Sequence, residues 1–138
     1  MYEFDRDNTD NISINLQQNL KMNIEEVRGY CLSKKGAIEG FPFDDTTLVV
    51  KVGDKIFALL NLEGEASINL KCDPARAMDL REMYPSIIPG YHMSKKHWNT
   101  VMLDGSLPND LILSMLDHSY DLVFSSLPEK LRIEINLI

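Results

Sequence analysis

Apolar residues recur at three- and four-residue spacing in three parts of the chain, which is the pattern of amphipathic helices. Asn23 followed by Glu26 has the form of a capping box, in which each side chain bonds the other residue's backbone N–H. Asp73 followed by Pro74 places a capping carboxylate directly before a proline at the first helical position. These patterns predict helices over 23–35, 74–84 and 108–126.

Between the helices, apolar and polar residues alternate with period two in segments rich in β-branched residues, which predicts strands. Gly53-Asp54 has the composition of a two-residue hairpin turn. Pro89 and Gly90 argue against regular structure at their own positions, and Lys95 and Lys96 are expected on a turn. The predicted strands are 46–52, 55–61, 66–71, 91–93 and 98–103.

The order of these elements, α-β-β-β-α-β-β-α, predicts an α+β fold. We expect two layers, with one antiparallel sheet and the helices on one of its faces. Residues 131–137 also alternate, which is consistent with a final strand. The two terminal segments 12–16 and 133–137 are each too short to be stable alone. We therefore expect at least one of them to be an ordered strand that pairs with the other, with the sheet edge or with a second subunit in a homodimer.

Length and charge narrow the class of protein. A chain of 138 residues with 44% hydrophobic residues is expected to form one domain with its own core. A net charge of −7 disfavours non-specific adhesion to nucleic acid and to anionic lipid. Cys31 and Cys72 are expected to be buried, reduced thiols. No apolar run is long enough to span a membrane and the first residues are polar, so a cytoplasmic location is expected.

One segment departs from this acidic composition. No carboxylate occurs between Tyr84 and Leu103, and the only tryptophan lies in this stretch. Lysines placed together can contact phosphate, and aromatic side chains can stack on bases or anchor a partner. The candidate contact residues for nucleic acid or another partner are Tyr91, His92, Lys95, Lys96, His97 and Trp98.

Structural roles compete with this interpretation. The lysines can simply be solvated on a turn. Trp98, Thr100 and Met102 share one face of the predicted strand, which favours burial of Trp98 in the core. His92 and His97 could face each other, but two histidines without a third ligand make a poor metal site. We predict no metal.

The remaining polar residues do not form a catalytic group in the sequence. Asp73 is explained as a helix cap, Asp104 as a turn residue and Asp117, beside His118, as helix surface. No P-loop, Rossmann, HExxH or GxSxG motif is present. Cys31 has no evident activating base. We therefore predict no catalytic residues and no cofactor, and a protein that is not an enzyme.

Five segments follow one another along the chain: FPF at 41–43, INLKCDP at 68–74, IPGYHMSKKHWNTV at 88–101, DHSYDLV at 117–123 and LPEKL at 127–131. Together they make the chain resemble the MmcQ/YjbR family of small bacterial proteins, over about residues 22–132. The resemblance implies a secretion-chaperone-like two-layer fold. It also implies binding of DNA, because the family carries a DNA-binding label that rests on a proposed double-wing arrangement. Residues 1–21 and 133–138 would then be extensions.

The leading hypothesis is a non-enzymatic binding protein that contacts nucleic acid through residues 91–98. The alternative is a protein-binding or chaperone-like module without a nucleic-acid role. A third interpretation is an enzyme or small-molecule binder that uses a pocket between the Pro89–Trp98 loop and Phe41–Phe43. A contiguous basic face would favour nucleic acid, and an exposed apolar groove would favour a protein partner.

Overall fold

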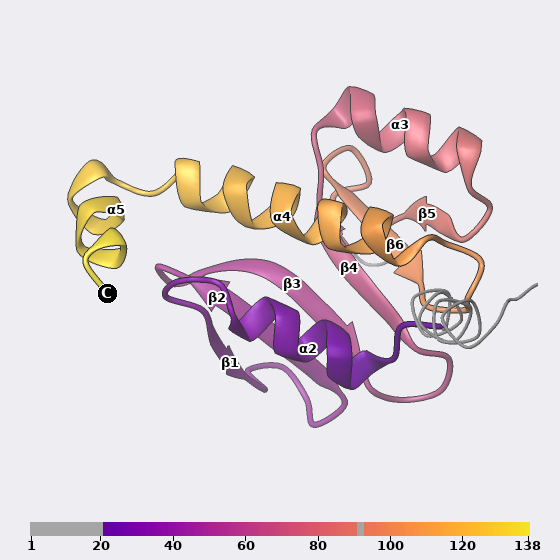
Figure 1. Ribbon diagram of the computed structural model, residues 1–138, viewed down its shortest axis with the longest axis horizontal. Helices are drawn as coiled ribbons and strands as arrows, with labels where there is room; N and C mark the ends of the chain where they lie inside the picture. The colour runs from indigo at the N-terminus through magenta and orange to yellow at the C-terminus, as the bar shows by residue number, and fades with distance from the viewer. Residues whose placement is uncertain (1–20, 91–92) are drawn as a thin grey trace, which may run out of the picture.

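The computed structural model of the chain describes residues 21–90 and 93–138. Figure 1 shows α4 running along the sheet, with α3 toward one of its ends and α5 toward the other. In chain order the elements are α2 (Ile24–Leu32), β1 (Ile38–Gly40), β2 (Thr47–Val52), β3 (Lys55–Asn61), β4 (Ser67–Lys71), α3 (Pro74–Met83), β5 (Ile87–Pro89), β6 (Trp98–Met102), α4 (Asn109–Ser125) and α5 (Glu129–Asn136).

The strands form one sheet in the order β1-β2-β3-β4-β6-β5, and every neighbouring pair is antiparallel. The predicted α+β class with an antiparallel sheet is therefore confirmed. Gly53 and Asp54 join β2 to β3 with φ values of 55° and 67°. Positive φ at both positions is the geometry of the predicted primed turn, whose twist matches that of the flanking strands.

The helix starts follow the capping patterns in the sequence. Asn23 accepts from the backbone N–H of Glu26 at 2.8 Å, and Glu26 accepts from the backbone N–H of Asn23 at 3.0 Å. Asp73 caps α3 by accepting from the backbone N–H of Arg76 at 3.3 Å. Each cap satisfies a backbone donor that the helix itself leaves unpaired.

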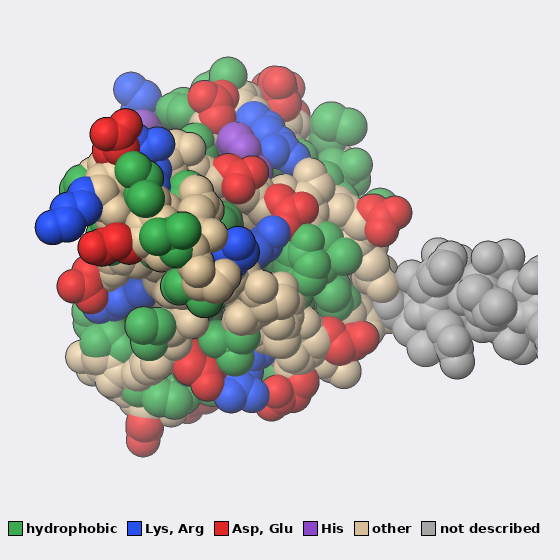
Figure 2. All heavy atoms as spheres, turned by 60° about the vertical axis from the view of Figure 1, so that its left-hand side comes forward, with side chains coloured by type: hydrophobic (Ala, Val, Ile, Leu, Met, Phe, Trp, Pro, Cys, Tyr) green, Lys and Arg blue, Asp and Glu red, His purple; other side chains and the backbone are tan. Residues whose placement is uncertain are grey.

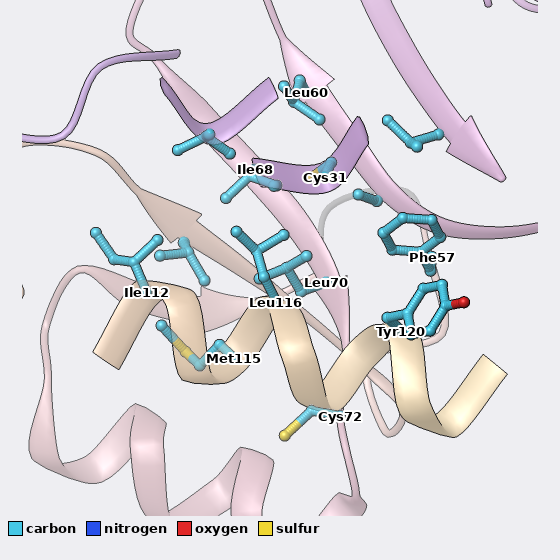
Figure 3. Close-up of a cluster of buried hydrophobic side chains, with 14 of the residues drawn as sticks. Cys31, Phe57, Leu60, Ile68, Leu70, Cys72, Ile112, Met115, Leu116 and Tyr120 are labelled. Atoms are coloured by element: carbon cyan, nitrogen blue, oxygen red, sulfur yellow. The ribbon is translucent and has the colours of Figure 1, made fainter. Parts of the chain in front are cut away.

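The core lies between one face of the sheet and the helices. Helix α4 packs on β2, β3 and β4, and α2 packs on β3 and α4. The β2–β3 register shifts by one residue at Val50, which gives β3 a β-bulge. Phe57 and Ala58 consequently both turn to the helices, and both are fully buried. Phe57 meets Tyr120 of α4 edge-on, with ring centroids 5.3 Å apart (Figure 3).

Two short elements at the sheet edges were not predicted correctly. β1 was missed because three residues ending in glycine carry no readable alternation; an Arg28–Glu39 ion pair with bonds of 2.6 and 2.7 Å ties it to α2. β5, at 87–89, was not predicted. Of the strand expected at 91–93, residues 91 and 92 lie outside the described residues and Met93 is not in a strand. β5 is an edge strand of the sheet. Proline has no backbone N–H, and an edge strand tolerates this because one of its sides has no neighbouring strand to bond.

The strand predicted over 131–137 is wrong, because α5 is a helix. Leu131 and Ile135 are four residues apart, so they share one helical face, and Ile135 belongs to the core. Ile133 and Leu137, which gave the segment its alternation, are exposed. The strand predicted at 12–16 lies outside the described residues, and the expected homodimer stays a prediction.

Candidate binding groove on the open face of the sheet

The sheet has a second face that is turned away from the helices, here called the open face. Side chains alternate between the two faces of a strand, and on each inner strand the residues that alternate with the core residues point to this one. On the four inner strands none of the open-face residues is a carboxylate, although the chain has 21 acidic residues. These residues are Thr47, Val49, Lys51, Ile56, Leu59, Asn61, Ser67, Asn69, Lys71, Trp98, Thr100 and Met102.

A groove of about 520 Å³ crosses the open face. Phe43 lines it from the loop between β1 and β2, and Met93 lines it from the loop between β5 and β6. The strands supply the floor. This volume lies within the range of sites that bind small molecules or a part of a larger ligand. The remaining lining residues are Thr47, Ile56, Leu59, Asn61, Ser67, Asn69 and Thr100.

The polar groups of the groove are all uncharged. Asn61 is engaged with the β3–β4 loop, since its Nδ2 donates to the carbonyl oxygen of Glu65 at 3.1 Å and its Oδ1 accepts from the N–H of Glu63 at 3.4 Å. Thr100 Oγ1 donates to Asn69 Oδ1, which fixes the amide of Asn69. Its Nδ2 bonds no residue in the described part of the chain and is available to an acceptor in the groove.

The carboxylate of Asp44, at one end of the groove, is directed at its own loop. It accepts from the backbone N–H groups of Thr46 at 3.0 Å and Thr47 at 2.7 Å, and from both threonine hydroxyls. These bonds, led by the one from the Thr46 N–H, hold the pKa of Asp44 below its usual value. The loop that carries Phe43 is thereby pinned beside the groove.

The structure places the predicted contact residues in different environments. Tyr91 and His92 lie outside the described residues. Lys95, Lys96 and His97 are exposed in the loop between β5 and β6. The prediction that Trp98 is buried in the core is wrong: Trp98 is half-buried and lies on the open face, opposite Lys71. The alternation did place Trp98, Thr100 and Met102 on one face, but the helices cover the other.

Arg81 of α3 holds the loop that carries these lysines. Its Nε donates to Asn99 Oδ1 at 2.7 Å, and its Nη2 donates to the backbone oxygens of Lys95 and, at 3.2 Å, Trp98. Asn99 is 1% exposed. Gly90 lies against the start of β6, where its N–H donates to the backbone oxygen of Trp98 at 2.9 Å. A Cβ at this position would lie 2.8 Å from the Trp98 Cβ, so the close approach requires glycine.

The residues of the DHSYDLV segment have structural roles in the helix layer. Asp117, predicted to be helix surface, accepts from Lys34 Nζ and, at 2.7 Å, from the hydroxyl of Tyr30, which ties α2 to α4. Burial opposes ionisation of Asp117, but these two bonds outweigh it and lower its pKa. Ser119 bonds β3 and β4, donating to the Phe57 oxygen at 2.6 Å and accepting from the Lys71 N–H at 2.9 Å.

The two cysteine thiols and the Asp104 carboxylate have pKa values that do not favour reactivity near neutral pH. Burial raises the pKa of the Cys31 thiol to about 12, and burial also raises that of Cys72. Asp104 accepts from Ser106 and Ser86, which lowers its pKa to about 2. Within residues 21–90 and 93–138, no three His, Cys, Asp or Glu residues gather as a metal site, and no helix is long and apolar enough to cross a membrane.

His118 makes the stability of the protein sensitive to mild acid. Its Nε2 accepts from the backbone N–H of Asp73 at 3.1 Å, a bond that requires this nitrogen to be unprotonated. Burial and then the charge of Arg76 lower its pKa, against weaker opposing effects of Asp73 and Asp121. The unfolded chain, with a histidine pKa of about 6.5, therefore binds more protons as the pH falls through that value.

We expect the melting temperature to fall between about pH 7.5 and pH 5.5, and to fall less in His118→Gln, whose amide oxygen can accept the same bond without titrating. The carboxylates of lowered pKa lose their stabilising effect only at more acid pH. Thermal melts followed by circular dichroism at intervals of half a pH unit measure the difference. Parallel curves for the two proteins would contradict the role given to His118.

The fold and the groove define a small α+β protein with one antiparallel sheet that is backed by helices on one face and grooved on the other. The chain belongs to the YjbR family, whose model matches residues 32–122. It is 38% identical over 112 residues to YjbR of Escherichia coli (strain K12), covering 80% of this chain and 95% of that protein. It is 40% identical over 91 residues to YbdF of Escherichia coli O157:H7, covering 65% of this chain and 75% of YbdF.

Solved structures agree with this family. The crystal structure of Deinococcus radiodurans protein DR2400, of domain family DUF419, matches with a TM-score of 0.79 and 38% identity over 85% of this chain and 92% of that one. A crystal structure of a Pseudomonas syringae protein matches with a TM-score of 0.66 and 31% identity over 74% of this chain and 99% of that one. The predicted family is confirmed.

Proposed function

We propose that this chain is a non-enzymatic binding protein of the YjbR family whose ligand is nucleic acid. The observation that carries the proposal is the open face, whose inner strands present no carboxylate in a chain of net charge −7. Lys51 and Lys71 lie on this face, and the exposed Lys95 and Lys96 extend from the loop beside it. Cationic groups on a face without acids give a polyanion a local surface that the overall charge does not repel at short range.

The charge elsewhere supports a local rather than a general nucleic-acid surface. On the side of the molecule shown in Figure 2, basic and acidic side chains are interspersed with apolar ones, without a continuous basic area. Binding through the open face would therefore be weak and sensitive to salt. Two buried free thiols suit a reducing compartment, so a cytoplasmic location is part of the same proposal.

The proposal is tested by removing the two loop lysines. In Lys95→Ala/Lys96→Ala the dependence of log K on log salt concentration should lose about 2 units of slope, because each lysine that neutralises a phosphate releases about one counterion. Fluorescence anisotropy of labelled DNA between 20 and 200 mM salt measures it. The matched control is Lys55→Ala/Lys130→Ala, which removes the same charge from exposed positions away from the open face.

Two outcomes would contradict the proposal. One is wild-type protein that binds neither single-stranded nor duplex DNA at the lowest salt. The other is a Lys95→Ala/Lys96→Ala protein that binds with the same affinity and slope as the control variant.

A protein partner is the second candidate, and a separate groove favours it. This groove, of about 410 Å³, lies at the β1 side of the molecule, where apolar side chains that include Phe41 and Leu62 line it together with the charged Glu25, Arg28 and Glu39. Phe41 is 50% exposed and Leu62 44% exposed. Exposed apolar surface of this kind is common at protein interfaces. Under this alternative, Phe41→Ala would abolish complex formation and the loop lysines would be dispensable.

A further inference from the structure

The groove on the open face is chemically suited to an unpaired nucleobase. Its lining combines apolar side chains with neutral hydrogen-bonding groups and contains no charged residue. A phosphate would find no counter-charge there, whereas a base presents two apolar faces and a polar edge. Phe43, 66% exposed at the rim, offers a ring on which a base can stack, and Met93 offers a thioether opposite it.

Asn69 supplies the polar contact for the edge of a base. The hydroxyl of Thr100 occupies its Oδ1, so the amide is oriented and its Nδ2 is the group left to donate. Carbonyl oxygens and ring nitrogens of bases accept such bonds. Leu59, which pairs with Asn69 across the ladder, is an apolar surface beside this donor. Asn69 thus matches the polar edge of a base, and Leu59 matches its apolar face.

Two lysines at one end of the groove could pair with the phosphates of a bound nucleic acid. Lys51 lies directly across the ladder from the groove residue Ile56, and Lys71 lies two residues beyond the groove residue Asn69, on the side where Trp98 begins β6. β2 and β4 flank β3, so the backbones of the two lysines are about 10 Å apart. The β2–β3 turn beyond Lys51 carries one exposed acid, Asp54, which lines a hollow together with Lys51, whereas the loops at the opposite end of the groove carry three, Asp45, Glu63 and Glu65.

A polyanion that ran lengthwise along the strands would meet these acids. The favourable path crosses the strands over the row of Lys51, Lys71 and Trp98. From this row a base can turn into the neutral groove. A base that is stacked and paired in a duplex cannot do so.

We propose that the groove on the open face receives a nucleobase of single-stranded nucleic acid, whose phosphates follow the Lys51–Lys71–Trp98 row. This inference rests on the proposed function and adds to it the form of the ligand, the path of its backbone and the base-contact residues Phe43 and Asn69.

The test compares four labelled or competing ligands by fluorescence anisotropy: a mixed-sequence 12-nucleotide DNA strand, its duplex, the same strand without bases, and free nucleosides. Wild-type protein is expected to bind the single strand about tenfold or more tightly than the duplex or the abasic strand. Phe43→Ala and Asn69→Leu should each weaken single-strand binding about tenfold and leave the abasic strand unaffected, which corresponds to the loss of one stacked base.

Controls separate contact from folding. Phe41→Ala removes a neighbouring exposed aromatic side chain that lies outside the groove and should bind as wild type does. Asn69→Asp is a second variant at the same site, which removes the donor and adds a carboxylate to the open face, so it should bind more weakly than Asn69→Leu. Melting temperatures of all four variants verify that each is folded.

The outcomes distinguish this inference from the function on which it rests. Absence of binding to every nucleic acid at low salt overturns both. Equal binding of single strand, duplex and abasic strand, or wild-type affinity in both Phe43→Ala and Asn69→Leu, leaves nucleic-acid binding in place and overturns the base site. Free nucleosides that bind as tightly as the oligonucleotide would assign the groove to a small molecule and overturn the single-strand ligand.

Discussion

Replacing Phe57 with alanine is expected to lower the free energy of unfolding by about 3–5 kcal/mol, the usual range for removing a buried aromatic ring. Phe57 is 0% exposed and packs edge-on against Tyr120, at the contact between β3 and α4. It reaches this position only because the β-bulge turns two consecutive β3 residues toward the helices. Its removal leaves a cavity at the centre of the core that the surrounding sheet cannot close.

The chain offers a matched control in Phe43, which loses the same atoms when changed to alanine but is 66% exposed. We expect Phe43→Ala to change stability by less than about 0.5 kcal/mol. Urea denaturation followed by circular dichroism, with equal slopes for the variants, measures both values. Similar losses for Phe57 and Phe43 would show that the bulge does not direct Phe57 into the core as described.

The sequence predicted the elements whose signals are local. The capping box at Asn23 and the turn at Gly53-Asp54 depend on a few adjacent residues, and the structure confirms both. The alternation in 131–137 was ambiguous because Leu131 and Ile135 fit a helical face as well as the segment fits a strand. The helix places Ile135 in the core. Tertiary packing therefore decided between two patterns that the residues allow.

The candidate groove depended on information that strand patterns do not contain. Alternation put Trp98, Thr100 and Met102 on one face, but which face the helices cover follows from the docking of α4 on β3 and β4. The sequence suggested a pocket between the Pro89–Trp98 loop and Phe41–Phe43; Met93 and Phe43 do line one groove, but Phe41 lines a different one. Asn69 was not identified from the sequence as a candidate contact residue. The available signal was the alternation of polar residues with Ile68 and Leu70, which places Asn69 on the face opposite the core.

Replacing Arg81 with alanine is expected to destabilise the protein by about 2–4 kcal/mol, since bonds from a charged donor contribute about 1.5–3 kcal/mol and the Oδ1 of the buried Asn99 would lose its partner. Arg81 bonds the buried Asn99 side chain, the backbone oxygen of Lys95 in the loop, and the backbone oxygen of Trp98 where β6 begins. Lysine should restore little, because a single ammonium group cannot reproduce the fork of the guanidinium. Arg76→Ala is the control from the same helix, with one bond of 3.0 Å to Ser114.

The second effect of Arg81→Ala separates a local role from a general loss of stability. Both loop lysines remain in this variant, yet their loop loses two of the bonds that hold its backbone against α3. At a temperature where the variant is fully folded, its affinity for DNA should fall toward that of Lys95→Ala/Lys96→Ala, while Arg76→Ala binds as wild type does. An Arg81→Ala protein that melts at a lower temperature but binds with unchanged affinity and salt slope would show that the position of this loop does not matter for binding. The open face alone would then have to provide the nucleic-acid surface.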